Sequence, residues 1–246
     1  MNIPFEFILT IDIGNSFSKC ALYSKDKSVI TKFDLEKLPA IITNYNLNDS
    51  NTLSIKSSVS DRDESIPLSC NDVKDLFKNQ TFLDMPVNYN ETVGLDRLVA
   101  AYFCYAKSKK SFLIIDTGTF TTIDSVDIKG FNGGYILPGL NTLEKSYSNG
   151  SLLEVPNSIN TELSFIFPNT TEKAIHQGAI LSFLAPIKEV ITQTDPSNVL
   201  ITGGNAELLY NYLNSQKSLL FRLDASIQLD LNLIHNALVE IAIRKN

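Results

Sequence analysis

Residues 9–22, LTIDIGNSFSKCAL, join an apolar, β-branched run to a lone carboxylate, Asp12, and then to a glycine and a small polar patch before the hydrophobic residues resume. Residues 112–128, FLIIDTGTFTTIDSVDI, repeat this arrangement, with Asp116 in the place of Asp12. Each copy predicts two strands joined by a tight turn that follows an aspartate. Two copies so far apart indicate a duplicated domain rather than a solenoid.

The rest of the chain predicts strands that alternate with helices. Leu53, Ile55 and Val59 alternate with polar residues, as in a half-buried strand at 52–60. An apolar run followed by Gly-Gly predicts a buried strand, a turn and a helix at 198–213. Further helices are predicted at 71–79, 95–110, most of 141–183, and 229–246. This alternation predicts an α/β architecture of two similar halves, residues 1–110 and 111–246.

The composition excludes several classes of protein. The 246 residues include 21 basic and 27 acidic side chains, a net charge of −6 that gives no electrostatic footprint for nucleic acid. No apolar run approaches the roughly 18 residues of a membrane span, and Glu6 without an early Lys or Arg disfavours a signal peptide. Cys20, Cys70 and Cys104 are odd in number and widely spaced, as expected in a reducing compartment. We therefore expect a soluble, cytoplasmic protein that binds neither nucleic acid nor a membrane.

The two aspartate turns have the chemistry of a phosphate site. A turn of small residues exposes backbone N–H groups in a concave arrangement that suits an anion such as phosphate. A carboxylate beside it can hold a cation that binds phosphate, and Ser16 and Lys19 add a hydroxyl and a positive charge. The pattern differs from the P-loop and contains no G-x-G-x-x-G. One copy alone favours a plain hairpin turn with an exposed aspartate, whereas two copies favour a clamp for a nucleoside triphosphate.

Two shorter motifs allow a functional and a structural interpretation. Gly203 and Gly204 follow a predicted strand, where they would let the backbone approach a flat group such as adenosine, or simply make a strand-to-helix turn. Asp96 could accept the proton of an attacking hydroxyl while Arg97 binds an anionic substrate. The alternative is an aspartate favoured by the helix dipole and a surface arginine.

Taken together and in this order, the motifs DIGNSFSK, GLDR, DTGTFTTID, GGYILPGL, NTTEKAIHQG and ITGG resemble those of the type III pantothenate kinases, from about residue 8 to 240. That family belongs to the acetate and sugar kinase/Hsp70/actin superfamily. The resemblance implies two ribonuclease-H-like halves, as in actin-like ATPases, with a nucleotide cleft between them. It also implies ATP-dependent phosphorylation of pantothenate, the first step of coenzyme A biosynthesis.

The resemblance implies roles for individual residues. The first phosphate loop and a threonine of the second would bind ATP: Asp12, Ile13, Gly14, Asn15, Ser16, Phe17, Ser18, Lys19 and Thr119. Asp12 would hold Mg²⁺ through water, and Asp116 would hold a monovalent cation, K⁺ or NH₄⁺.

The resemblance also implies a substrate site. Gly94, Leu95, Asp96 and Arg97 match the pantothenate-binding segment, with Asp96 as the proton acceptor. Thr171 matches a threonine that reaches the substrate across the interface of a homodimer.

The sequence departs from the family pattern at three places. Ser16 stands where the family commonly has threonine, and Phe120 where it commonly has alanine, so that a ring could reshape the nucleotide pocket. The usual Tyr-x-Asn-Pro segment is absent. Tyr89 lies at a shifted position and is assigned to the substrate as a hypothesis.

Two other functions stay open. Some relatives of this family are transcriptional accessory factors, and other superfamily members phosphorylate other acids or sugars. The presence of Asp12, Asp96, Arg97 and Asp116 argues against a non-catalytic binder, since a binder needs no general base. Most sugar kinases of the superfamily are considerably longer than this chain, which disfavours the second of these alternatives. His176 and His235 lie on predicted helices without partners at metal-ligand spacing.

Overall fold

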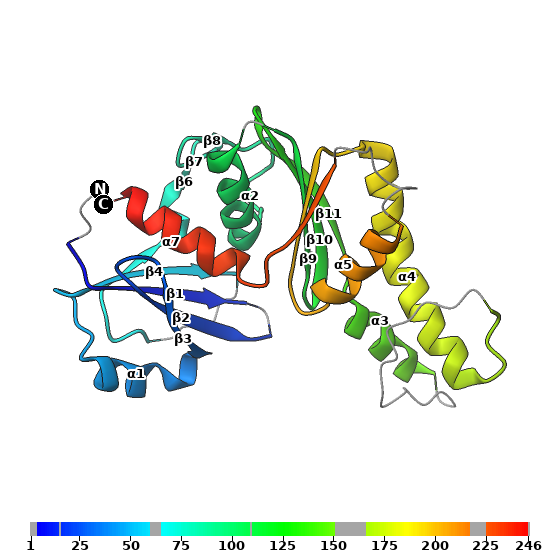
Figure 1. The fold of residues 1–246 in the computed structure, drawn as a ribbon, viewed down its shortest axis with the longest axis horizontal. Helices are drawn as coiled ribbons and strands as arrows, with labels where there is room; N and C mark the ends of the chain where they lie inside the picture. Colours follow the sequence, from blue (N-terminus) through cyan, green and yellow to red (C-terminus); the bar gives the residue numbers. More distant parts are fainter. Residues whose placement is uncertain are drawn as a thin grey trace. The chain divides into compact units, whose positions relative to one another are not determined.

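The computed structural model describes residues 4–14, 16–59, 65–108, 110–150, 166–216 and 225–245. The chain forms two compact units (Figure 1). The first consists of Met1–Lys109, Ile128–Gly133 and Asn232–Asn246, and the second of Lys110–Asp127 and Gly134–Leu231.

The first unit contains a five-stranded sheet of order β3-β2-β1-β4-β5. Its strands are β1 (Phe7–Ile13), β2 (Ser18–Ser24), β3 (Val29–Asp34), β4 (Thr52–Ser58) and β5 (Cys70–Asp72). β2 runs antiparallel to both β1 and β3, whereas β4 runs parallel to β1 and β5.

The second unit repeats this topology. Its sheet has the order β11-β10-β9-β12-β13. The strands are β9 (Phe112–Thr117), β10 (Phe120–Asp127), β11 (Gly130–Pro138), β12 (Asn198–Thr202) and β13 (Ser226–Leu229). β9 is antiparallel to β10 and parallel to β12, as β1 is to β2 and β4. The same strand order in both sheets, with the same directions at the three corresponding central pairs, confirms the duplication that the two aspartate turns predict.

Helices cover both faces of the first sheet. α1 (Leu38–Tyr45) buries Leu38 in a cluster with Leu9 and Ile11 of β1. α2 (Leu95–Lys107) packs against α7 (Leu233–Lys245), which lies against β1 and β4 (Figure 1). A one-turn helix, η1 (Leu35–Lys37), precedes α1.

One predicted helix is wrong. Residues 71–79 form the end of β5, a single 3₁₀ turn, η2 (Val73–Leu76), and a short strand, β6 (Phe77–Lys78). The side chain of Asp72 caps only this turn, by accepting the N–H of Lys74, because the backbone then pairs with β7 (Thr81–Phe82). β8 (Met85–Pro86) completes this small sheet.

The second unit has its core between its sheet and two helices. α4 (Thr171–Thr194) and α5 (Ala206–Ser215) pack Ile187 and Leu209 against Ile115 and Ile201 of β9 and β12. α3 (Leu140–Ser146) lies against α4, and Tyr147 of the following η3 (Tyr147–Asn149) reaches Gly178 of α4. α3 and α4 confirm the two ends of the predicted helical region, and residues 151–165 lie outside the described ones.

The sequence-based boundary near residue 110 differs from the structure at two segments. α7 lies in the first unit because its buried face packs on α2, β1 and β4. Ile128–Gly133, which includes the start of β11, also lies there, because it pairs with the chain that follows β8, so β11 is divided between the two units at Gly133. The tail helix begins at Leu233 and not at Leu229, which ends β13.

Where the chain is described, no helix has the length and hydrophobicity needed to span a bilayer. The three cysteines form no disulfide with one another, and Cys20 and Cys104 are buried.

Candidate active site

The first predicted phosphate loop is the tight turn between β1 and β2. Gly14 N–H donates to the carbonyl oxygen of Phe17 at 3.0 Å. A Cβ atom on Gly14 would lie 3.0 Å from that oxygen, so glycine lets the turn close. Ser16 and Phe17 are exposed, and Phe17 has 71% of its surface in solvent. Asn15 lies outside the described residues.

Asp12 extends from the face of the sheet opposite the α1 core. Its neighbours across the strands are Lys19 of β2 and Ser57 of β4. Side chains alternate along a strand, so Asp12 lies on the other face from Ile11 and Ile13, which pack with α1. The buried Ser57 hydroxyl makes no hydrogen bond within the described part of the chain. Such an orphaned polar group beside a half-buried carboxylate fits a bound water or hydrated ion.

The second predicted loop joins β9 to β10 and is held by the start of α3. The carbonyl oxygen of Thr119 accepts the N–H of Gly139 at 3.0 Å and the hydroxyl of Thr142 at 2.6 Å. A Cβ atom on Gly139 would lie 2.2 Å from the Gly118 carbonyl oxygen, so the two segments touch by backbone alone. Thr119 and Phe120 are exposed beside this loop, where Phe120 has 49% of its surface in solvent.

Asp116 lies against the turn that follows β12. A Cβ atom on Gly203 would come within 2.4 Å of Asp116 Oδ1, and Gly203 has a φ of +95°. The hydroxyl of Thr117 donates to Thr202 O at 2.9 Å, and Asn205 N–H donates to Thr117 O at 3.1 Å. The packing of this turn on the β9–β10 loop therefore requires a glycine at position 203. A bound adenosine is not needed to explain the glycine.

The predicted substrate segment forms the first turn of α2. Gly94 is the N-cap, and Asp96 Oδ1 accepts the N–H of Arg97 at 2.8 Å. A Cβ atom on Gly94 would lie 2.6 Å from Asp96 Oδ1, so glycine gives the carboxylate its position over the helix end. Leu95, between them, is half-buried.

Asp96 has the electrostatics of a proton acceptor. Part of the residue is exposed, but burial of the carboxyl group raises its pKa above the ordinary aspartate value. The hydrogen bond from the Arg97 N–H and the positive charge of Arg97 oppose this shift. Burial dominates because the free energy that the carboxylate ion loses with its hydration is larger than the free energy that one amide N–H and one nearby cation restore.

Two aromatic rings hold the Arg97 guanidinium. Arg97 is 5% exposed, and its Cζ lies 5.2 Å from the Tyr89 ring centroid and 5.5 Å from that of Phe131. The structure thus brings Tyr89, Asp96 and Arg97 together. Phe131 was not predicted from the sequence. The glycines around it, in GFNGG at residues 130–134, were the one sign that this segment packs closely against another part of the chain.

The remaining predicted residues are divided between the two units. Thr171 is the exposed first residue of α4, where the side chain of Thr170 caps the helix by accepting Lys173 N–H at 3.3 Å. Thr171, Asp116 and Thr119 belong to the second unit. The first loop and the Tyr89–Arg97 segment belong to the first.

Each histidine lies against a side chain of another element. His176 Nδ1 lies 3.3 Å from Glu144 Oε1 in a buried pair between α4 and α3, and His235 Nδ1 lies 2.9 Å from Thr10 Oγ1. No group of three or more His, Cys, Asp or Glu side chains in the described ranges could hold a metal ion. Single carboxylates such as Asp12 suit Mg²⁺, which keeps waters and binds substrate phosphates.

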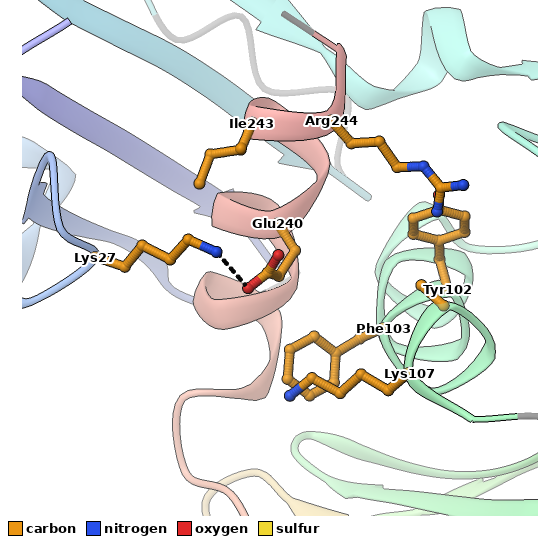
Figure 2. A pocket seen from close by; sticks show the side chains of 8 residues that line it. Lys27, Tyr102, Phe103, Lys107, Glu240, Ile243 and Arg244 are labelled. Atoms are coloured by element: carbon orange, nitrogen blue, oxygen red, sulfur yellow. Dashed lines mark hydrogen bonds and ion pairs between the residues drawn. The ribbon is translucent and has the colours of Figure 1, made fainter. Parts of the chain in front are cut away.

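A separate pocket of about 510 Å³ lies in the first unit between α2 and α7. Figure 2 shows Phe103 and Lys107 extending from α2 and Glu240 and Ile243 extending from α7, with Lys27 paired to Glu240 at 3.0 Å. The Lys107 ammonium lies 3.5 Å from the Phe103 ring centroid. None of the residues predicted for the active site lines this pocket.

Comparison with known proteins identifies the family. A sequence model described as type III pantothenate kinase matches residues 8–193. A type III pantothenate kinase of Flavobacterium psychrophilum is 30% identical over 220 residues, which cover 85% of this chain and 91% of that protein.

Solved structures share the fold. A Campylobacter jejuni protein described as belonging to the Baf family of transcriptional activators aligns over 97% of this chain and 98% of its own, with a TM-score of 0.59 and 23% identity. A Sinorhizobium meliloti protein described as a 2-dehydro-3-deoxygalactonokinase aligns over 97% and 98%, with a TM-score of 0.58 and 10% identity. These likenesses confirm the expected two-lobed α/β fold, and the sequence matches show that the chain belongs to the type III pantothenate kinase family.

Proposed function

We propose that the protein transfers the γ-phosphoryl group of ATP to the hydroxyl of pantothenate and so forms 4′-phosphopantothenate, the first step of coenzyme A biosynthesis. One observation carries the proposal: in a member of this kinase family, the buried carboxylate of Asp96 has a raised pKa and adjoins the fixed guanidinium of Arg97. This pair supplies a general base and a receptor for an anionic substrate.

Asp96 accepts the proton that the substrate hydroxyl loses as its oxygen attacks the γ-phosphorus. Its Oδ1 is oriented by the Arg97 N–H, and the carboxylate has a second oxygen for the hydroxyl. A base is most effective when its pKa lies near the working pH, so the raised pKa of Asp96 favours this role.

The two aspartate loops bind the nucleotide. Backbone N–H groups of the first loop, with Ser16, Ser18 and Lys19, bind phosphate oxygens, and Thr119 contacts the nucleotide from the second loop. Asp12 holds Mg²⁺ through water, which fits its half-buried carboxylate and the orphaned Ser57 hydroxyl. When bound, the ion neutralises phosphate charge.

Asp116 holds K⁺ or NH₄⁺ in this proposal. Its half-buried carboxylate lies against the backbone at Gly203 and would supply a negatively charged oxygen ligand to the ion.

The pantothenate site is shared by two chains of a homodimer in the cytoplasm. Tyr89, Gly94 and Leu95 surround the substrate beside Asp96 and Arg97, and Thr171 of the second chain contacts it. The exposed position of Thr171 at the start of α4 suits such a contact.

An assay that couples ADP release to NADH oxidation, run over a panel of alcohols that includes pantothenate, tests the proposal. We expect ADP release that depends on pantothenate and a phosphorylated product of matching mass. Turnover of a different acid or sugar, and not of pantothenate, would assign that compound as the substrate. The absence of turnover with any alcohol would favour a non-catalytic accessory factor.

A further inference from the structure

We propose that Phe131 is a positioning residue: with Tyr89 it holds Arg97 as the receptor for the substrate carboxylate, and it thereby sets the preference for the acid over uncharged analogues. The inference rests on the proposed function for the identity of the acid, and adds to it a residue outside the substrate segment.

The geometry restricts Arg97 from two sides. Its Cζ lies 5.2 Å from the Tyr89 ring centroid and 5.5 Å from that of Phe131, while the rings are 6.0 Å apart with an interplanar angle of 60°. The guanidinium is planar by its own delocalisation, and the two inclined rings beside it restrict the orientation of that plane and so the direction of its N–H donors. Carboxylates are bound best by two parallel N–H donors in such a plane, so the rings preorganise the receptor.

The chain segment that carries Phe131 is fixed in its place. Asn88 N–H donates to Phe131 O at 2.8 Å, and Asn88 Nδ2 donates to Asn132 Oδ1 at 3.2 Å. A Cβ atom on Gly130 would lie 2.0 Å from the Pro86 carbonyl oxygen, so the segment lies against the chain after β8. Phe131 itself is fully buried.

Tyr89 depends on the same segment. Gly133 has a φ of +90°, and a Cβ atom there would lie 3.2 Å from Tyr89 Cδ2. Both rings beside Arg97 are therefore placed by residues 128–133, which follow the second aspartate repeat in the chain and belong to the first unit. Their long separation from residues 94–97 explains why the sequence motif did not include Phe131.

The test compares Phe131→Leu with Phe82→Leu in the full chain. Phe82 is equally buried in the same unit and packs edge-on against Tyr102, so its replacement is a matched loss of one ring from a different ring pair. The substrates are pantothenate and its N-pentyl amide, which keeps the reacting hydroxyl and lacks the carboxylate.

We expect Phe131→Leu to raise the KM for pantothenate roughly three- to thirtyfold, as for a desolvated cation–π contact, with kcat and the KM for ATP unchanged. Turnover of the amide should not change, so the preference for the acid falls. Phe82→Leu should leave that preference at its wild-type value. An equal loss with both substrates in Phe131→Leu would overturn the positioning role.

A double variant separates action through Arg97 from a general structural effect. If Phe131 acts through Arg97, Phe131→Leu should raise the KM for pantothenate little further in an Arg97→Ala background. Full additivity of the two effects would contradict the proposal.

A spectroscopic readout keeps this inference separate from the proposed function. The Arg97 Nε–Hε resonance should be shifted by ring currents in the wild-type protein and move toward the free-arginine position in Phe131→Leu but not in Phe82→Leu. If wild-type protein fails to phosphorylate pantothenate, the proposed function fails while this measurement still decides the placement of Arg97. An unmoved resonance in Phe131→Leu overturns the placement.

Discussion

Asp96 combines a buried carboxyl group with a position at the start of a helix, and the two have opposite effects on its charge. Burial raises its pKa, whereas the helix N-terminus and the Arg97 N–H favour the ionised form. The balance gives a carboxylate that can take up a proton more readily than a surface aspartate. Gly94 is part of this balance, because any Cβ atom there would displace the carboxylate.

Asp96→Asn should therefore lower kcat by roughly 10²–10⁴-fold, because the amide keeps the shape but cannot accept the hydroxyl proton. The KM for ATP should change little, since the proposed nucleotide site lies on the two aspartate loops. Steady-state kinetics measure both quantities, and circular dichroism checks the fold. Glu91→Gln, an exposed acid just ahead of the same helix, is the control. Near-normal turnover in Asp96→Asn would remove this residue from the mechanism.

At the scale of elements, the two aspartate hairpins have one topology but different surroundings. The β1–β2 turn is closed by its own backbone, through Gly14 and Phe17. The β9–β10 turn is held from outside, by the start of α3 and by the Gly203 turn. The ions proposed for the two turns also differ. A hydrated divalent ion is proposed at Asp12, and a monovalent cation is proposed at Asp116.

Loss of either aspartate should reduce turnover, but with different ion dependence. Asp12→Ala should raise the Mg²⁺ concentration needed for half-maximal rate. In Asp116→Ala, the stimulation that K⁺ or NH₄⁺ gives the wild-type enzyme should be absent. Initial rates over titrations of MgCl₂, KCl and NaCl measure both effects. Equal wild-type rates in sodium and potassium buffers would contradict the role of Asp116.

The C-terminal helix α7 is fixed to the first sheet by buried polar contacts. His235 lies against Thr10 of β1, and Tyr23 OH donates to Asn236 Oδ1 at 3.3 Å. Burial, followed by the charges of Lys32 and Lys19, lowers the pKa of His235 to about 4. The folded protein thus keeps this histidine neutral where an unfolded chain would protonate it.

This shift predicts a pH dependence of stability. Between the ordinary histidine value of 6.5 and about 4, the unfolded state binds a proton that the folded state does not, so the free energy of unfolding falls as the pH falls. The full effect is about 3 kcal/mol, at 1.36 kcal/mol per pH unit. His235→Gln should lack this histidine contribution to the pH dependence. The difference between the unfolding free energies of variant and wild type, measured with urea, should therefore change between pH 7 and pH 4. A pH-independent difference would contradict the prediction.

At the scale of the whole molecule, residues with one proposed function belong to different units. Asp96 and Arg97 belong to the first unit, while Thr171 and Asp116 belong to the second. A twofold homodimer would let each chain contribute Thr171 to the substrate site of the other, giving two equivalent composite sites.

Mixing two inactive variants tests the shared site. Asp96→Asn and Thr171→Arg should each be strongly impaired alone. After subunit exchange at equal amounts, half of the dimers are mixed and each holds one intact site, so about a quarter of the wild-type rate should return. Native mass spectrometry verifies exchange, and sedimentation gives the oligomeric state. No recovery after verified exchange, or a fully active monomer, would refute the model.

The sequence by itself determined the duplication, because each copy is a local pattern: an alternating apolar strand, an aspartate, a small-residue turn and a second strand. It also determined α2, whose Leu98, Ala101 and Tyr102 recur at helical spacing and are buried. Strand β3 was missed because Phe33 is its one buried side chain, which leaves no alternation to detect.

The tertiary structure alone decided which distant segments meet. The return of α7 to the first unit depends on its packing against α2, β1 and β4, and the placement of Phe131 depends on pairing with the chain near Asn88. Gly133 and Gly203 likewise owe their positive φ angles and close contacts to residues far away in the chain. The hydrophobic periodicity of a segment predicts which of its side chains are buried. The surface that covers those side chains is determined by the packing of the whole unit.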